Sequence, residues 1–562
     1  MKREHRLLIL LCLVACLVSA AAGWNNSATN DEPYFTLGAY AAFEGKGIFV
    51  VEHPPLYKLF AGLSLHFLPL RSSDEGRGAA FHDLPTTIHR FLHRNTVPGL
   101  HILRVARLGM LAFLPLLLWG VFRLGELVGG PKVGLAAALA LACQPLVLGH
   151  AFVVHTDVPA AACWVWVVVM VERALSGVPW AWMGTGLWLG LALAAKHSAV
   201  LLILLLAVRL LVARLRGQAI PWRWLAGAFL GSWLLVLALT SWTLRHVSVG
   251  EEQELVRLVS EKLSPWSWVS PVFLPLAALC KACCHWFLGL AFVVWNSTHG
   301  QGVNFFWGQL SPYGFALYFP VALLIKLSLP FTALWVAAVV SWRTLPRLAR
   351  WLGVYVALYL LASLGSAFNI GARHLMPAVA FLAVPAGWGL LRLGKPLRLA
   401  AIAALVAAPV VVFPHYIAHF SMLAGGARGG ERILNDSNLD WGQDWARVAM
   451  LARERGWRPL FAVYLGPDDA SAYGTPVENL LLTGRFPEHG FVAVSSWAAA
   501  VGPAYFEYFG LRENARFLRS LLGVVSLCPK VGEVGHTIRI YRCGAATQGP
   551  QGTPGLSPNP RE

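Results

Sequence analysis

Long apolar runs separated by short polar segments make up the first three quarters of the chain. A helix of about 20 residues spans the roughly 30 Å hydrocarbon core of a membrane, so such runs predict membrane-spanning helices. They occur at residues 7–23, 105–126, 132–150, 158–174, 181–195, 198–213, 224–244, 315–340, 351–367, 375–391 and 399–415. Lys196 and His197 interrupt the stretch 181–213, which therefore predicts two short helices. The pattern predicts an α-helical polytopic membrane protein with about eleven transmembrane helices.

A further apolar run at residues 271–295 is less regular. Pro271, Pro275, Cys280 and Lys281 interrupt it, so we expect a helix in the membrane interface. If this run instead spans the membrane, the topology after it is inverted.

Basic residues fall in alternate connections between the predicted spans, as expected for cytoplasmic loops. These residues are Lys2, Arg3, Arg6, Lys132, Arg173, Arg209, Arg214, Arg216, Arg223, Arg343, Arg347, Arg350, Arg392, Lys395 and Arg398. The N-terminus is therefore predicted to be cytoplasmic, with loops 24–104 and 245–314 and the C-terminal part on the outer face. Residues 1–23 also fit a cleavable signal peptide, although we favour a retained anchor.

After residue 415 the sequence becomes mixed polar and apolar. Residues 416–544 contain a helical pattern at 442–456 and strand-like runs at 459–465, 491–497 and 536–542. We therefore divide the chain into a transmembrane domain at 1–415 and a small extracytoplasmic α/β domain at 416–544. Residues 545–562 are rich in Pro, Gly and Gln and predict a disordered tail.

Composition supports this membrane assignment. The chain is 57% hydrophobic and 13% charged, whereas soluble domains have about 25% charged residues. Its net charge of +17 is largely explained by the cytoplasmic loops, so it does not predict a nucleic-acid partner.

Nine cysteines are scattered along the chain. Cys528 and Cys543, both in the predicted outer domain, leave a disulfide or two free thiols as alternatives. Cys280, Cys283, Cys284 and His285 leave a zinc site as a minor alternative.

Acidic and basic side chains gather at the outer ends of several predicted spans. They are Asp31, Glu32, Glu52, His53, His155, Asp157, Lys196, His197, Arg373 and His374. Charged residues near a membrane core cost about 2.5–3.5 kcal/mol each on insertion scales, so they normally face a cavity, a partner or water. Singly, each has a structural explanation, such as a helix cap or a side chain that reaches the lipid headgroups. Together, on one face, they predict a shared site.

Cations and carboxylates in one site suit glycosyl transfer from a lipid phosphate. A sugar phosphate already has a good leaving group, so one carboxylate as base and several cations for the phosphate are sufficient. A glycosidase would need two carboxylates, which Asp31 and Glu52 could imitate. A polyprenyl-lipid transporter or flippase, or a non-catalytic lipid-binding membrane protein, is the main alternative. Transporters usually contain internal repeats, and none is evident here.

The stretch "NDEPYFTLGAYAAFEGKGIFVVEHPPLYK" at residues 30–58 resembles the first outer loop of membrane glycosyltransferases with the C-type fold. The similar families are the protein O-mannosyltransferases and the lipid A aminoarabinose transferases, which belong with or near glycosyltransferase family 39. By this resemblance Asp31 is the catalytic base, Glu52 is an acid at the site, and "HTDVP" carries the second acidic motif with Asp157. "LALAAKHSAVLL" resembles the Lys-containing helix junction, and "GARHLMP" the motif in which Arg373 helps to bind the donor phosphate.

The resemblance implies an enzyme of the bacterial inner membrane that uses a polyprenyl-phosphate-linked sugar and inverts the anomeric carbon. The acceptor would be a protein, a lipid or a glycan. No cofactor is certain; we assume that no metal is required, although a divalent metal is possible. "YFPVALLIKLSLP" and "NDSNLDWGQDWARV" resemble a bacterial subgroup, but Asp436, Asp440 and Asp444 are better interpreted as acids at a helix N-terminus.

Overall fold

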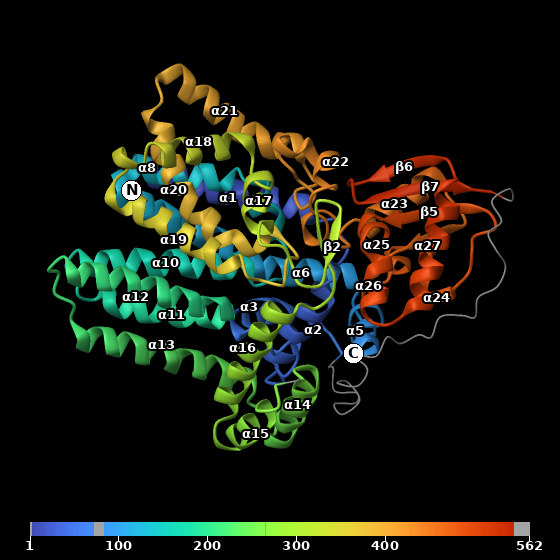
Figure 1. The fold of residues 1–562 in the computed structure, drawn as a ribbon, viewed down its shortest axis with the longest axis horizontal. Helices are drawn as coiled ribbons and strands as arrows, with labels where there is room; N and C mark the ends of the chain where they lie inside the picture. The colour runs from blue at the N-terminus through green and yellow to red at the C-terminus, as the bar shows by residue number, and fades with distance from the viewer. Residues whose placement is uncertain (1–2, 72–83, 265, 545–562) are drawn as a thin grey trace.

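The computed structural model describes residues 3–71, 84–264 and 266–544. A bundle of long helices is followed by a smaller C-terminal domain built on a β-sheet (Figure 1). This confirms the predicted fold class of a helical membrane protein with a small α/β domain. The predicted disordered tail at 545–562 lies outside the described residues.

The bundle and its loops contain most of the helices. They are α1 (Arg3–Gly23), α2 (Glu32–Phe43), α3 (Pro55–Leu65), α5 (Leu84–His93), α6 (Gly99–Leu111), α7 (Phe113–Gly129), α8 (Pro131–Ala142), α9 (Pro145–Ala151), α10 (Asp157–Leu175), α11 (Ala181–Ala195), η1 (His197–Ala199), α12 (Val200–Leu215), α13 (Trp222–Thr243), α14 (Val249–Lys262), α15 (Val269–Leu279), α16 (Lys281–His299), α17 (Tyr318–Ile325), α18 (Leu329–Val340), η2 (Trp342–Thr344), α19 (Arg347–Ser363), η3 (Ala372–Leu375), α20 (Met376–Arg392) and α21 (Lys395–Val412). A short hairpin of β1 (Asn304–Phe306) and β2 (Gln309–Ser311) precedes α17.

All eleven predicted apolar runs are mainly helical, but not all are straight single spans. Among the described residues, seven helices are long and apolar enough to cross a membrane, and two bent pairs bring the total to nine. The bends are 72° between α8 and α9 and 116° between α17 and α18. The remaining two runs form α11 and α19, which have 15 and 17 residues and are shorter than a typical span.

Burial separates central helices from peripheral ones. In the most apolar stretches of α10 and α20, 78% of residues are buried, against 11% in α21. Large apolar side chains of α21, such as Val410 and Val411, are exposed, as expected for a surface that faces lipid. Close packing inside the bundle depends on small residues: a Cβ added to Gly125 on α7 would lie 2.7 Å from the backbone of Gly134 on α8.

The run 271–295, predicted as one interfacial helix, forms parts of two helices. The chain breaks at Cys280 between α15 and α16. Cys280 forms a disulfide with Cys283, and His285 faces Glu252 with 3.2 Å between Nδ1 and Oε2. Cys280, Cys283 and His285, three of the four residues of the alternative zinc site, thus have other partners in this structure.

The C-terminal domain is a five-stranded mixed sheet covered by helices on both faces (Figure 1). The strand order is β4-β3-β5-β7-β6, with β3, β4 and β5 parallel and β7 and β6 antiparallel. Its elements are η4 (Met422–Ala424), α22 (Gly426–Gly430), η5 (Asp436–Asn438), α23 (Trp445–Arg455), β3 (Leu460–Val463), η6 (Ala470–Tyr473), β4 (Glu478–Asn479), α24 (Leu480–Thr483), β5 (Gly490–Ser495), α25 (Ser496–Ala500), α26 (Gly502–Tyr508), α27 (Arg512–Ser526), β6 (Lys530–Val534) and β7 (Ile538–Cys543).

Successive side chains of β5 point to opposite faces of the sheet. Val492 and Val494 pack with residues of α27, whereas Ala493 packs with residues of α23. The predicted helix at 442–456 and the three predicted strands are confirmed as α23, β3, β5 and β7. A disulfide joins Cys528 to Cys543, one of the two alternatives for this pair.

One buried lysine fixes the start of the C-terminal domain to the bundle. Lys326 lies in the bend between α17 and α18, and its ammonium group donates to the carbonyls of Ile417, His419 and Asn438. A charge buried in this way needs hydrogen-bond acceptors on all sides, and the carbonyls supply them. The bent pair therefore holds the segment that enters the C-terminal domain.

Candidate active site

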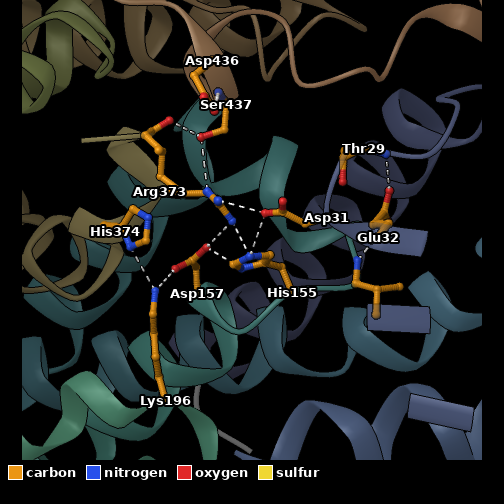
Figure 2. Close-up of polar contacts among 12 residues, drawn as sticks. Thr29, Asp31, Glu32, His155, Asp157, Lys196, Arg373, His374, Asp436 and Ser437 are labelled. Carbon is orange, nitrogen blue, oxygen red and sulfur yellow. Dashed lines mark hydrogen bonds and ion pairs between the residues drawn. The ribbon is translucent and has the colours of Figure 1, made fainter. Parts of the chain in front are cut away.

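Six of the predicted site residues meet at the end of the bundle that faces the C-terminal domain (Figure 2). They are Asp31, His155, Asp157, Lys196, Arg373 and His374. Each stands at or beside a helix end, where the backbone turns and a polar side chain can leave the apolar layer. Four segments far apart in sequence thus supply one ionic cluster.

Asp157 is the central acid of this cluster. It begins α10, is 2% exposed, and accepts a hydrogen bond of 2.5 Å at Oδ1 from Nζ of Lys196. Its Oδ2 lies 2.7 Å from Nδ1 of His155. Lys196, at the end of α11, also lies 3.2 Å from Nδ1 of His374. A buried carboxylate with this many partners is stabilised in its charged form.

Arg373 connects Asp157 to Asp31. Its Nη2 donates to Oδ2 of Asp31 at 2.9 Å, and its Nη1 lies 3.7 Å from Oδ2 of Asp157 and also contacts His155. Burial would raise the pKa of Asp31, but the charge of Arg373 and the hydrogen bond from His155 outweigh it and lower that pKa. The side chain of Asp31 is 34% exposed, whereas that of Arg373 is 2% exposed. Asp31 is thus an ionised carboxylate that remains accessible.

The C-terminal domain supplies part of the environment of Arg373. Nε of Arg373 donates to Oγ of Ser437 at 3.2 Å, and the guanidinium lies 4.2 Å from the ring centre of Trp441. A Cβ added to Gly371 would lie 2.1 Å from Oγ of Ser437, so this close approach requires glycine. The two domains therefore build the cluster jointly.

Glu32 is next to Asp31 in sequence but has a different environment. Its carboxylate is fully buried and accepts from Nε and Nη2 of Arg107 at 2.8 and 2.6 Å. It also accepts from the backbone N–H groups of Thr29 and Val154, at 2.9 and 3.0 Å. Figure 2 shows its side chain directed toward Thr29 rather than toward the cluster. These contacts suit a positioning role for Glu32 better than the predicted contact with substrate.

Glu52 and His53 lie in the loop between α2 and α3. His53 packs beside the cluster, with its ring 5.9 Å from that of His155, and burial lowers its pKa well below the usual value. Burial raises the pKa of Glu52, and the negative charge of Asp31 acts in the same direction. Lys58 shapes the turn by donating to the carbonyls of Phe49 and Val50, at 2.9 and 3.0 Å.

His197 follows Lys196 but packs away from the cluster. It is 2% exposed, and its ring lies 4.9 Å from that of Trp286. A Cβ on Gly289 would come within 2.7 Å of its Nε2, which shows how closely α16 covers it. Of the ten predicted residues, Glu32 and His197 are thus outside the ionic cluster, and Glu52 and His53 are at its edge.

Three contributors were missed by the sequence analysis as site residues. Arg107 lay inside a predicted apolar span, where a lone arginine indicates a buried partner. Ser437 and Trp441 belong to the acid-rich stretch 435–444, which was interpreted only as the start of a helix. Nothing in the spacing of these residues predicts that this stretch reaches Arg373.

The next question is whether the residues of the cluster have the arrangement of a metal site. Within the described ranges, no group of three or more His, Cys, Asp or Glu side chains has the arrangement needed for a metal ion. Asp31 and Asp157 instead have Arg373 and Lys196 as cationic partners.

Comparisons with known proteins agree with this architecture. Residues 101–242 match the family model described as dolichyl-phosphate-mannose-protein mannosyltransferase. The structure is similar to that of ArnT from Cupriavidus metallidurans in the apo state, with 15% sequence identity and a TM-score of 0.50 over 98% of this chain and 100% of that one. No curated protein sequence matches the chain significantly.

Two further structures match at lower similarity. ArnT from Cupriavidus metallidurans bound to undecaprenyl phosphate is 14% identical, with a TM-score of 0.49 over 97% of this chain and 99% of that one. The archaeal oligosaccharyltransferase AglB from Archaeoglobus fulgidus is 11% identical, with a TM-score of 0.45 over 90% of this chain and 72% of that one. The fold and the family-model match thus confirm the predicted resemblance: the chain is a polytopic membrane protein with the C-type glycosyltransferase fold and, in residues 101–242, the sequence pattern of the mannosyltransferase family.

Proposed function

We propose that this protein transfers a sugar from a polyprenyl-phosphate donor to an acceptor hydroxyl. The observation that carries the proposal is the convergence of Asp31, Asp157, Lys196 and Arg373 from separate helix ends into one cluster. The family-model match supports the same class of donor, since the description of that family names dolichyl-phosphate mannose, a sugar linked to a lipid phosphate. The cluster combines an accessible carboxylate with buried cations, which is what this transfer requires.

Lys196 and Arg373 would hold the donor phosphate. Both have donor groups directed into the cluster, and the planar guanidinium of Arg373 can bind a phosphate with two parallel hydrogen bonds. Trp441 and Ser437 keep Arg373 in position. His155 and His374 lie against these cations and would complete the surroundings of the phosphate.

Asp31 would act as the base. As the acceptor oxygen attacks the anomeric carbon, the bond from that carbon to the phosphate oxygen breaks, and the hydroxyl proton moves to the carboxylate of Asp31. The polyprenyl phosphate departs with its negative charge held by Lys196 and Arg373, and a single displacement inverts the anomeric carbon. A bound phosphate would also compete for Arg373, which would weaken its ion pair with Asp31 and raise the basicity of that carboxylate.

The site would face the outside of a bacterial inner membrane. Helix α1 begins at the end of the bundle opposite the C-terminal domain (Figure 1), which supports a cytoplasmic N-terminus and an extracytoplasmic domain. Basic residues in alternate connections favour the same orientation. A lipid-linked donor would then reach the cluster from the membrane.

The substitution Asp31→Asn tests this function. We expect transfer to fall by about 100-fold or more, because general-base catalysis contributes about 10²–10⁴-fold, while the lipid phosphate still binds. The measurement uses purified protein in lipid nanodiscs, a panel of radiolabelled polyprenyl-phosphate sugars, and a membrane extract as acceptor. Equal transfer by the native and variant proteins would contradict the role of Asp31. No transfer from any donor would favour lipid transport instead.

A further inference from the structure

An acid and three aromatic side chains lie on the C-terminal-domain side of Asp31. They are Tyr34 on α2, Asp436 on η5, Trp497 on α25 and Tyr505 on α26, and all four are half-buried. Figure 2 shows Asp436 beyond Arg373, on the side away from Asp157 and Lys196. We call these four residues the acid–aromatic cluster.

Contacts join the members of this cluster to one another and to the site. Nε1 of Trp497 donates to Oδ2 of Asp436 at 3.2 Å, and the rings of Trp497 and Tyr505 are 5.4 Å apart and inclined at 67°. Burial, Tyr505 and the charge of Asp31 together raise the pKa of Tyr34. Asp436, Trp497 and Tyr505 thus contact one another directly, and Tyr34 lies near enough to Asp31 and Tyr505 for their charges to act on it.

The carboxylate of Asp436 can accept further hydrogen bonds. Its Oδ1 accepts from its own neighbour, the backbone N–H of Ser437, at 2.5 Å, and Oδ2 accepts from Trp497. No ion pair to Asp436 occurs in the part of the chain that the structure describes, although Arg373 is near enough for its charge to act on this carboxyl group. A carboxylate has about four lone-pair sites, so unused capacity remains on both oxygens.

We propose that the acid–aromatic cluster binds a sugar ring of the acceptor, which makes the acceptor a glycan or glycolipid. This inference rests on the proposed function. The apolar C–H face of a pyranose packs against aromatic rings, while its hydroxyl groups donate to carboxylates. Asp31 accepts a hydrogen bond from the acceptor hydroxyl that reacts, and Asp436 accepts one from a neighbouring hydroxyl of the same sugar.

The two carboxylates, Asp31 and Asp436, favour a sugar over a peptide as the acceptor. A serine or threonine side chain offers one hydroxyl group, which Asp31 alone would satisfy. A second carboxylate on the acceptor side has a use when the acceptor has a second hydroxyl near the first. A site built to hydrogen-bond a substrate hydroxyl discriminates strongly against analogues that lack it.

Two substitutions test this inference. Asp436→Asn removes the charge and retains the shape, and asparagine tolerates the left-handed backbone conformation of this residue, with φ of 59°. Trp497→Leu removes the ring. The matched control is Glu488→Gln, which removes an exposed acid from the same domain.

Transfer is measured in nanodiscs with radiolabelled polyprenyl-phosphate sugars and two acceptor probes, para-nitrophenyl hexosides and a hexapeptide containing Ser and Thr. We expect transfer to a hexoside, with its KM raised about tenfold in each variant, because a charge-assisted hydrogen bond or a stacking contact is lost. We expect kcat and the KM for the donor to change little, and the control to behave as native.

Four results would overturn the inference. Transfer to the hexapeptide alone would exclude a sugar acceptor, and an unchanged hexoside KM in both variants would exclude the cluster as its site. A fall in kcat with an unchanged hexoside KM would make Asp436 part of the catalytic machinery instead. Native protein that consumes no donor, even with water as acceptor, would contradict the proposed function itself, and this inference with it.

Discussion

At the scale of single residues, neighbours in sequence have separate tasks. Asp31 and Glu32 are one acidic pair in the sequence, and the sequence analysis placed both in one site, Asp31 as the base and Glu32 as a substrate-binding residue. At the start of α2, however, Asp31 faces Arg373, whereas Glu32 is buried against Arg107. Successive residues of a helix point about 100° apart, so a motif predicts the residue types without assigning a common direction.

The Glu32–Arg107 pair has a testable energetic role. Replacement of Glu32 by Gln leaves Arg107 as an uncompensated buried charge, which costs about 3–5 kcal/mol of unfolding free energy. We expect a clear fall in the melting temperature in nanodiscs, measured by tryptophan fluorescence. Asp31→Asn is the control with a smaller effect, because Asp31 is partly exposed. Unchanged melting of Glu32→Gln combined with lost donor binding would support direct contact with substrate.

A buried acid in the C-terminal domain predicts a pH dependence of stability. Burial raises the pKa of Asp440 to about 6, whereas an unfolded aspartate has a pKa of about 3.9. Between these values the folded protein keeps a proton that the unfolded chain has lost, so unfolding free energy falls as pH rises from about 4 to 6. Asp440→Asn should reduce this slope. Melting temperatures at pH 4–7 test it, with Glu488→Gln as control, and an unreduced slope would contradict it.

At the scale of elements, the hydrophobic pattern predicted most of the helices but little of how they arrange the site. The apolar runs became helices because lipid leaves backbone groups no other partner. The same pattern predicted one continuous span at residues 315–340, which the structure divides by a 116° bend between α17 and α18. The bend depends on long-range contacts of Lys326 with the chain near residues 417–438, which no local pattern encodes.

Replacement of Lys326 by Met tests the importance of this bend. Three buried carbonyls lose their donor, and each unsatisfied group costs about 1–3 kcal/mol. We expect faster amide hydrogen exchange in residues 434–442, together with reduced transfer. Lys281→Met is the matched control, because Lys281 donates to carbonyls at Leu244 and Val247 instead. Equal protection of 434–442 in the native protein and Lys326→Met would contradict the assigned role.

At the scale of the whole molecule, the C-terminal domain holds the loop that ends at Asp31. Backbone N–H groups of Ser27 and Asn30 donate to the carbonyls of Gln443 and Trp441, at 3.0 and 2.7 Å. Ser437 and Trp441 also contact Arg373. Sequence could predict two domains, because composition changes between them. It could not predict their interface, which depends on side chains that meet only after both have folded.

A second connection between the domains runs through Tyr473. Its hydroxyl accepts from the backbone N–H of Ala28 at 3.1 Å and donates to Oδ2 of Asp468 at 2.6 Å. Oδ1 of Asp468 lies 3.0 Å from Nε2 of His93 on α5, and both side chains are buried. One tyrosine hydroxyl thus links the C-terminal domain to the loop before Asp31, while Asp468 links it to α5.

Tyr473→Phe removes that hydroxyl and retains the ring. Ala28 then loses its acceptor and Asp468 one donor, so the loop at residues 26–31 should open more often while both domains stay folded. We expect faster amide exchange in this loop and a fall in transfer, because Asp31 is held less firmly against Arg373. Tyr508→Phe, at an exposed tyrosine of the same domain, should leave both unchanged. Native exchange in the loop combined with lost transfer would mean that the hydroxyl acts on the substrate rather than through the position of Asp31.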